Sequence, residues 1–553
     1  MPPYLTTAGK ALLASALTWF CAAALLATMG KSQAVWPVLL GASAMLGVLI
    51  VAYFITIPVG RILDNMLQVS VKPPQAGAHL LTHDTVHPRL LLHNRSGWRL
   101  RLTHTIPEAS TPLSCDAECL PSLDLDAHAW LQTAIPTTAH RSGRWFIHGI
   151  HLTALTSFSL FAVRTYKAAP LAMLFLPKPL PQAQQHQPTA LTLDERFGMH
   201  FIRQRGFGTD LREIREHQPG DPFRNIAWKA TARCGRLMVR DFESERAINA
   251  YLLLDISTTM RGARHQQDKL EHALRLIVDF SRNLLRGNDQ CGLITFDERI
   301  YGHLPPREGR LHFQRLQKHL LGLHRVVDEG LTEYDEDEVI DALVRFLMLQ
   351  FRLDFRRRAP RRHSTNRPPA IEDHIDVELL NRWLRSAIHD QAPTSLAEER
   401  VGIVRAKQLS LARHFCLLHG VEIPFRTEAR FGTKEHGLVA ALEAAIVRAK
   451  GPTLVLIITD LSGLMHTERL VKTLHLARAK RHKVAFLVPV APSYVNPSDQ
   501  SPEQSILHEI FAAGDRHERR RVLRALRQAS VPNIEIHATD RIEPILQRLR
   551  LLH

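Results

Sequence analysis

Two long uncharged stretches near the N-terminus place the strongest constraint on how this chain can fold. No charged residue occurs at positions 11–30 or at positions 32–60. About 20 apolar residues in a helix are enough to cross the hydrocarbon core of a bilayer, and both stretches reach that length. The sequence therefore predicts a transmembrane helical hairpin within residues 1–62, with helices at about 11–29 and 36–58.

A cleaved signal peptide is the alternative explanation of the first stretch, because the small residues Ser32 and Ala34 resemble a cleavage site. Only one basic residue precedes this stretch, and a second apolar stretch follows it directly, so an uncleaved anchor is favoured. The charge bias of short loops does not orient the hairpin, because the flanking basic residues are few. They are Lys10, Lys31, Arg61 and Lys72.

The composition is that of a folded protein in a reducing compartment. Of 553 residues, 45% are hydrophobic and 22% are charged, and 70 Lys+Arg against 54 Asp+Glu give a net charge of +16. This basic balance suits an anionic partner or membrane surface without identifying it. Six cysteines exclude a disulfide scaffold. The 31 histidines form no HExxH motif and no CxxC pair occurs, so the sequence does not support a zinc site.

Short alternating runs follow the hairpin and predict a β-rich, sandwich-like domain at residues 63–180. Examples are the runs at 89–107, 143–155 and 157–166, which Pro, Ser, Thr and Asp-rich turns separate. A Pro- and Gln-rich stretch at 177–190 then reads as a linker.

From residue 249 to residue 553 the pattern changes to strands that alternate with helices, which predicts a doubly wound α/β domain. A segment at about 331–424 interrupts this alternation. It has five acidic residues at 333–338 and a run of arginines between Arg352 and Arg367, and it reads as a helical insertion with a flexible basic loop. Strands are expected at 250–257, 291–300, 452–463, 483–490 and 533–538, and helices at 268–287, 309–323, 436–450, 467–480 and 518–529, with a closing helix.

Polar residues follow two of the apolar strands, where a doubly wound sheet places its binding sites. Asp255, Ser257 and Thr259 leave the first strand, and Asp460 ends another. Two carboxylates and two hydroxyls on one edge of the sheet are suitable ligands for Mg²⁺ or Mn²⁺. The alternative is that each aspartate caps the helix that follows it. For the pair together, the metal site is the favoured interpretation.

The segments DISTT, LITFDERI and LIITDLSG resemble the von Willebrand factor type A fold with its metal-ion-dependent adhesion site. That motif is Asp-x-Ser-x-Ser, then a distal Thr, then a distal Asp. Asp255, Ser257 and Asp460 match it directly, and Thr259 keeps the hydroxyl of the second Ser. The distal threonine is Thr433 in the favoured alignment, with Thr332 as the runner-up.

A second resemblance spans most of the chain and rests on the linker and signature segment at residues 181–248. The stretch GTDLREIREHQPGDPFRNIAWKATARCGRLMVRDFESE resembles the signature of the domain-of-unknown-function-58 family. His217 and Ala227 depart from the family pattern. The segment forms either a structural clasp or a surface for partner contact. The matching residues are Arg215, Gly220, Asp221, Arg224, Ile226, Trp228, Ala232 and Arg233.

Together, the resemblances imply a membrane-anchored, non-enzymatic protein-binding module that carries Mg²⁺ or Mn²⁺. Its implied partner is a MoxR-type AAA+ ATPase, with which it assembles or activates an unknown client protein. The implied location is the inner membrane, as a multi-pass protein with most of the chain in the cytosol and in contact with membrane lipid.

Two alternatives belong to other functional classes. The first is a Mg²⁺-dependent phosphatase of haloacid dehalogenase type, with Asp255 as nucleophile. Such an enzyme needs a second aspartate two residues later as general acid, and Ser257 stands there instead. The second is binding of anionic lipid or nucleic acid through the arginine-rich loop. No aromatic residues are interleaved there, so specific nucleic-acid binding is not expected.

Overall fold

The computed structural model divides the chain into two compact units, one formed by residues 1–178, 321–397 and 407–426 and the other by residues 179–320, 398–406 and 427–553. Four predicted features lie wholly or partly outside the described residues: the linker, Gly220, the basic loop and the closing helix. The described residues are 3–29, 32–74, 80–115, 122–155, 159–178, 205–206, 210–219, 221–243, 249–261, 268–286, 289–357, 374–391, 409–426, 432–449, 451–490, 519–537 and 540.

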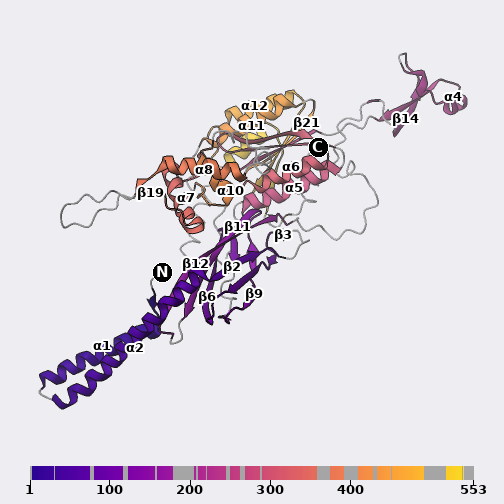
Figure 1. Ribbon diagram of the computed structural model, residues 1–553. Helices are drawn as coiled ribbons and strands as arrows, with labels where there is room; N and C mark the ends of the chain where they lie inside the picture. The colour runs from indigo at the N-terminus through magenta and orange to yellow at the C-terminus, as the bar shows by residue number, and fades with distance from the viewer. Residues whose placement is uncertain are drawn as a thin grey trace. The chain divides into compact units, whose positions relative to one another are not determined.

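The first unit begins with the two apolar helices that the sequence predicts. Helix α1 spans Thr7–Thr28 and α2 spans Ser32–Asn65 (Figure 1). Both are long and apolar enough to cross a membrane, with mean hydropathies of 1.9 and 2.4 in their most apolar windows. A β-carbon on Gly41 would lie 2.5 Å from the Trp19 ring, so the missing side chain lets the two helices approach closely.

Helix α2 continues past its apolar stretch into the core of a β-sandwich. Val59 and Leu63, in its last turns, pack with buried side chains such as Leu90, Leu102 and Ile150. One facing sheet has the order β1-β12-β11-β6-β8 with β3 beside β12, and the other has the order β2-β5-β9. A third sheet of this unit has the order β4-β10-β7.

The strands of these sheets are β1 (Tyr4–Leu5), β2 (Leu67–Lys72), β3 (Leu80–Leu81), β4 (Thr85–Val86), β5 (Arg89–Asn94), β6 (Leu100–Ala109), β7 (Leu113–Cys115), β8 (Leu123–Leu125), β9 (Trp130–Ala134), β10 (Thr137–Ala139), β11 (Gly143–Leu155) and β12 (Phe161–Leu176). The inward side chains alternate with outward ones, as in β5, where every second residue is buried. This alternation is the period-2 pattern that the sequence shows, and it gives each sheet one apolar face.

The helical segment after residue 331 packs with this first unit. Its elements are α7 (Glu336–Phe351), α8 (Val377–Gln391), α10 (Leu411–His419) and the short pair β19 (Arg356–Arg357) and β20 (His374–Ile375). A capping box formed by Asp335 and Glu338 starts α7. The helices share an apolar core that includes Val339, Leu343 and Phe415.

The second unit contains a six-stranded sheet with the order β18-β17-β16-β21-β22-β23. All neighbouring pairs are parallel except β17 and β18, so the edge strand β18 runs antiparallel. Counted in chain order, the strands follow 3-2-1-4-5-6, and the order reverses between β16 and β21. The strands are β16 (Asn249–Asp255), β17 (Gln290–Phe296), β18 (Ile300–Arg307), β21 (Thr453–Ile458), β22 (Lys483–Pro489) and β23 (Asn533–Ile536).

Helices cover this sheet on two sides (Figure 1). On one side, α11 (Lys434–Arg448) and α12 (Glu468–Ala479) pack with buried residues of the strands, including Leu253, Ile457 and Phe486. On the other side lie α5 (Lys269–Arg286) and α6 (Arg310–Leu321). The strands are buried on both faces, which explains why they read as continuous apolar runs.

Candidate functional site at the edge of the second sheet

The two aspartates singled out by the sequence lie at the same edge of the sheet, on neighbouring strands. Strand β16 ends at Asp255, and β21 ends at Ile458, two residues before Asp460. The strands pair in parallel with Leu254 opposite Ile458, so their carboxyl ends coincide. Asp255 is completely buried, and Asp460 is 3% exposed. The carboxylates therefore meet at the point where the strand order reverses.

One backbone N–H and two hydroxyl groups of the DISTT segment connect the two carboxylates. The Ser257 backbone N–H donates to Asp255 Oδ1 at 2.9 Å, and Ser257 Oγ lies 3.0 Å from Thr259 Oγ1. Thr259 Oγ1 donates to Asp460 Oδ1 at 3.1 Å. Thr259 is held there by a short 3₁₀ turn at Thr258–Met260. The structure thus brings together Asp255, Ser257, Thr259 and Asp460, as the sequence predicts.

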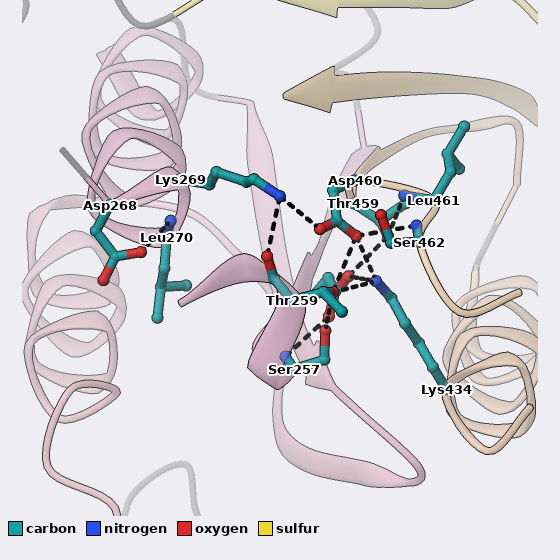
Figure 2. Close-up of polar contacts among 11 residues, drawn as sticks. Ser257, Thr259, Asp268, Lys269, Leu270, Lys434, Thr459, Asp460, Leu461 and Ser462 are labelled. Atoms are coloured by element: carbon teal, nitrogen blue, oxygen red, sulfur yellow. Dashed lines mark hydrogen bonds and ion pairs between the residues drawn. The ribbon is translucent and has the colours of Figure 1, made fainter. Parts of the chain in front are cut away.

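A lysine that the sequence analysis did not single out lies between the two carboxylates (Figure 2). Lys434 Nζ is 2.5 Å from Asp255 Oδ2 and 2.7 Å from Asp460 Oδ1. It also donates to Thr259 Oγ1 at 3.1 Å. The three protons of the ammonium group are therefore matched by three oxygen acceptors.

A second lysine reaches the same cluster from α5 (Figure 2). Lys269 Nζ donates to Asp460 Oδ2 at 2.9 Å and to the Thr259 carbonyl oxygen at 3.0 Å. The side chains of Lys269 and Lys434 are 15% and 4% exposed. Two buried carboxylates thus face two ammonium groups, so the cluster is charge-balanced.

The pKa values of the cluster follow from these pairings. Burial alone would lower the pKa of Lys434, but the adjacent carboxylates of Asp255 and Asp460 outweigh it and hold that pKa above its usual range. Burial would likewise raise the pKa of Asp460, and the two lysines reverse this and hold it below its usual range. Both groups are therefore charged at neutral pH.

Thr459 supplies a further hydroxyl that sequence reasoning missed. Its Oγ1 donates to Asp255 Oδ2 at 2.7 Å, and the Leu461 backbone N–H approaches the same hydroxyl at 3.4 Å. Leu461 has a φ of +62°, a left-handed conformation that a branched side chain rarely adopts. The next backbone N–H, that of Ser462, donates to Asp460 Oδ1 at 3.1 Å. The loop after β21 therefore wraps around its own carboxylate.

The first turn of α11 brings Lys434 into the cluster. The Gly432 N–H donates to the Gly463 carbonyl oxygen at 3.1 Å, and Glu435 Oε2 accepts from the His466 N–H at 2.7 Å. A β-carbon on Gly437 would lie 1.9 Å from the Asp297 carbonyl oxygen, so only glycine permits this approach. These contacts fasten the start of α11 to the loops at the sheet edge.

The two candidate threonines have different surroundings. Thr433 directly precedes Lys434 and occupies the N-cap position of α11 in the second unit. Thr332 belongs to the first unit, where its hydroxyl donates to the Asp328 carbonyl oxygen at 3.0 Å and accepts from Arg413 Nη1 at 2.8 Å. Of the two, Thr433 is therefore the one adjacent in sequence to a member of the cluster.

The arrangement does not fit a divalent cation, although its oxygens are of the right type. Mg²⁺ requires close to octahedral oxygen coordination, and the Lys434 nitrogen occupies the place between the two carboxylates that such an ion would take. The two lysines already neutralise both carboxylates. Within the described residues, no group of three or more His, Cys, Asp or Glu side chains is arranged to hold a metal ion. Magnesium at this edge stays a prediction that the donor set does not favour.

The signature segment forms a small module with its own clasp. Strands β13 (Arg205–Gly206), β14 (Asp210–Glu216) and β15 (Met238–Glu243) pair in the order β13-β15-β14. Arg215 donates to both Asp221 oxygens at 2.7 Å, and Asp221 also accepts from the Gln218 N–H at 2.8 Å. These bonds, led by those from Arg215, hold the pKa of Asp221 below its usual range.

The other predicted signature residues lie beyond this clasp. Trp228, the first residue of α4 (Trp228–Cys234), is 64% exposed, and Phe223, which begins a 3₁₀ turn at Phe223–Asn225, is 73% exposed. Arg224 and Arg233 lie in that turn and in that helix. Arg215 and Asp221 thus have a structural role. Phe223 lies beside the His217 ring of the same module, with ring centroids 6.3 Å apart, and both aromatic side chains stay largely exposed.

Residues 213–352 match the family described as "Protein of unknown function DUF58". The chain carries a DUF58 domain. This confirms the resemblance drawn from the signature, and the matched DUF58 region also includes Asp255, Ser257 and Thr259. Lys434 and Asp460 lie after its end.

Curated relatives share the DUF58 region over a short length. "Uncharacterized protein YeaD" of Bacillus subtilis (strain 168) is 28% identical over 128 residues, which are 23% of this chain and 29% of that protein. "Uncharacterized protein Rv1480" of Mycobacterium tuberculosis (strain ATCC 25618 / H37Rv) is 26% identical over 107 residues, 19% of this chain and 34% of the relative. The chain thus spans about a third of the length of these relatives.

Among solved structures, this chain is similar to the "conserved hypothetical protein BatB from Bacteroides thetaiotaomicron". The sequence identity is 13% and the TM-score is 0.25, over 55% of this chain and 98% of that one. At this level the similarity adds nothing to the fold or the function.

Proposed function

We propose that this chain is a membrane-anchored, non-enzymatic protein-binding module whose contact surface is the sheet edge around Asp255 and Asp460. The observation that carries the proposal is the position of that cluster, at the reversal of strand order between β16 and β21. In open α/β sheets, ligands bind outside the carboxyl ends of the strands at this point. Lys269 of α5 and Lys434 of α11 also reach this edge. The edge therefore carries more polar side chains than the strand ends alone supply.

The strand order 3-2-1-4-5-6 with an antiparallel edge strand supports the resemblance to a type A domain. On that resemblance, the partner is a MoxR-type AAA+ ATPase, which supplies the energy of ATP hydrolysis for assembling or activating a client protein. The two apolar helices would anchor the pair at the inner membrane, with most of the chain in the cytosol.

Asp255 is poorly placed for the alternative role of a phosphatase nucleophile. It is completely buried, Oδ1 accepts from Ser257, and Oδ2 accepts from both Thr459 and Lys434. A nucleophile must reach the substrate with a free lone pair, and a general acid is needed where Ser257 stands. These contacts support a binding role over a catalytic one.

The test is capture of the ATPase by the full chain in detergent, using a variant at the sheet edge. Met465 is 43% exposed and lies beside Gly432, next to the start of α11. Met465→Arg places a bulky charge on the proposed surface and should weaken binding at least about tenfold. Val447→Arg is the matched control, because Val447 is 74% exposed at the other end of α11.

Equal binding by the wild type and Met465→Arg would contradict the proposed surface. Loss of binding by Val447→Arg alone would move the surface to the opposite edge. Phosphate release from a generic phosphomonoester that stops in Asp255→Asn would favour the phosphatase instead.

A further inference from the structure

We infer that Lys434 and Lys269 are built-in cations that take the place of a divalent metal at the edge of the second sheet. The cluster is thus a closed, metal-independent ion-pair network that joins β16, β21, α5 and α11. It binds no Mg²⁺ or Mn²⁺ in the folded wild-type chain.

The Lys434 nitrogen lies where a cation shared by the two carboxylates would lie. The Lys434 nitrogen lies 2.5 Å and 2.7 Å from oxygens of two different carboxylates and 3.1 Å from a hydroxyl oxygen. Those three oxygens, of Asp255, Asp460 and Thr259, are the ones that the sequence predicts as metal ligands. A divalent ion shared by them would have to occupy the space that the ammonium group fills (Figure 2).

The charges of the cluster also disfavour a divalent ion. Two carboxylates in a buried site need close to two positive charges, because unpaired ions in a medium of low dielectric constant are strongly disfavoured. Lys434 pairs with both aspartates and Lys269 pairs with Asp460, so the two ammonium groups match the two carboxylates of these ion pairs. Asp297 also acts on Asp255 and Lys434 through its charge, and it has Arg261 among its own neighbours. Adding a divalent ion would leave two excess positive charges in a buried cluster, and binding would require that Lys434 withdraw or lose its proton.

The packing of α11 on the sheet holds Lys434 in the cluster. Lys434, Leu438 and Leu442 repeat at helical spacing on the buried side of α11, so the lysine belongs to the face that packs on the sheet. The Gly432 and Glu435 contacts described above fix the first turn of that helix. The ammonium group is therefore positioned by the packing of α11, and its withdrawal would require that packing to open.

This closure also changes what a partner can contact. A metal with an open coordination position would receive an acidic side chain. The three protons of Lys434 are all directed to acceptors inside the cluster, so it offers no such position. A partner that binds at this edge would instead meet the loop residues around it.

The experiment compares the full chain in detergent with and without divalent ions. Between excess EDTA and a few millimolar Mg²⁺ or Mn²⁺, the wild type should show no binding heat and no change in unfolding midpoint. A stoichiometric heat, or a midpoint raised by several degrees, would overturn the inference.

Lys434→Met is the variant that should gain a response to metal, because it leaves the carboxylates in place and opens the space between them. We expect a lower midpoint in EDTA, by on the order of 10 °C, and substantial recovery with Mn²⁺. The double variant Asp255→Asn, Lys434→Met should lose the Mn²⁺ response. Lys483→Met, at the opposite end of strand β22, should behave like the wild type.

A folded Lys434→Met variant that ignores Mn²⁺ would show that the lysine does not stand in for a cation. If that variant does not fold, the wild-type titration still decides the outcome. No partner is present in these measurements, so they are independent of whether the chain binds an ATPase.

Discussion

Thr459 illustrates how much of the sheet edge depends on one hydroxyl group. The side chain is completely buried and donates to Asp255, the carboxylate that also pairs with Lys434. Asp255 Oδ2 thus accepts two bonds, and the loss of one would leave a buried charge less well satisfied. The hydroxyl contributes through a charged acceptor, where hydrogen bonds are strongest.

We expect Thr459→Val to destabilise the second unit by about 1–3 kcal/mol, because the shape is kept and the hydrogen bond is lost. Thr459→Ser, which keeps the hydroxyl, should cost about 1 kcal/mol, the transfer free energy of one methyl group. Urea unfolding of the full chain measures both. If the valine variant were as stable as the wild type, the hydroxyl would contribute nothing.

Four of the five predicted site residues come together because their types and spacing carry the information. Hydroxyls two and four residues after a strand-end aspartate lie close to it in the sequence. Parallel strands place their carboxyl ends at the same edge of the sheet. Lys434 carries no such local signal. Its place on the apolar face of α11 could have been noticed, since a lysine on a buried stripe needs an anionic partner. Which carboxylate it meets depends on the packing of a helix from elsewhere in the chain.

At the scale of elements, the end of α12 has a common helix-ending geometry but lacks the glycine that usually accompanies it. The end of α12 is a Schellman motif, with the His482 N–H bonded to the Ala477 carbonyl oxygen and the Arg481 N–H to that of Arg478. Arg481 has a φ of +62° at the position where glycine is favoured. The β-carbon of this exposed arginine therefore strains the backbone, and no contact described for its side chain offsets that strain.

Arg481→Gly should stabilise the second unit by about 0.5–1 kcal/mol, since glycine adopts the left-handed conformation without strain. Arg481→Ala keeps the β-carbon and serves as the control, with no expected gain. Thermal unfolding of both variants decides the matter. A gain in the alanine variant would mean that the arginine side chain, and not the backbone, is the source of the strain.

Most elements of the second unit could be predicted from periodicity, because parallel strands buried on both faces read as apolar runs and amphipathic helices separate them. The antiparallel strand β18 is not predicted beyond its first residue, because the expected strand ends at residue 300. The tight turn at Asp297, whose N–H donates to the Arg299 carbonyl oxygen, lies within what reads as one strand with a polar end. The association of the helical segment α7–α10 with the first unit also has no local signal, because it rests on contacts distant in sequence.

At the scale of the whole molecule, buried histidines make stability depend on pH. Burial lowers the pKa of His319 to about 4, and burial, aided by Arg275, lowers that of His272 to about 4. Both are buried in the second unit. Their neutral forms are compatible with the fold, whereas the unfolded chain protonates them near the ordinary pKa of about 6.5.

The free energy of unfolding should therefore be unaffected by His319 above pH 6.5 and fall as the pH drops from 6.5 towards 4. The sign follows from the lowered pKa, since the unfolded state binds the proton first. By pH 5 the loss from His319 is about 2 kcal/mol. Urea unfolding at pH 7.5 and pH 5 should show a smaller drop for His319→Gln than for the wild type. An equal drop would assign the pH dependence to other groups.

The proposed anchor makes a second prediction at this scale. A reporter that is active only outside the cytosol, fused after His553, should give no signal, because a hairpin returns the chain to the side from which it entered. Activity equal to that of a secreted control would place the second unit outside the cytosol. A cytosolic reporter at the same point is the matched fusion.

The end of α2 has a mechanical consequence. No flexible linker separates the apolar part of this helix from Leu63, which is fully buried in the sandwich core. Asp64 adds a clamp, because its carboxylate accepts from Thr165 at 2.6 Å and its carbonyl oxygen accepts from Lys167 at 2.6 Å. The helix continues across Pro58, which removes one backbone hydrogen bond just before Leu63, so a tilt of α2 in the bilayer is passed on to the sandwich through this weaker point. In a chain anchored as proposed, the anchor would hold the sandwich at the membrane surface. A change in local membrane thickness that tilts α2 would also change the orientation of the sandwich relative to the membrane.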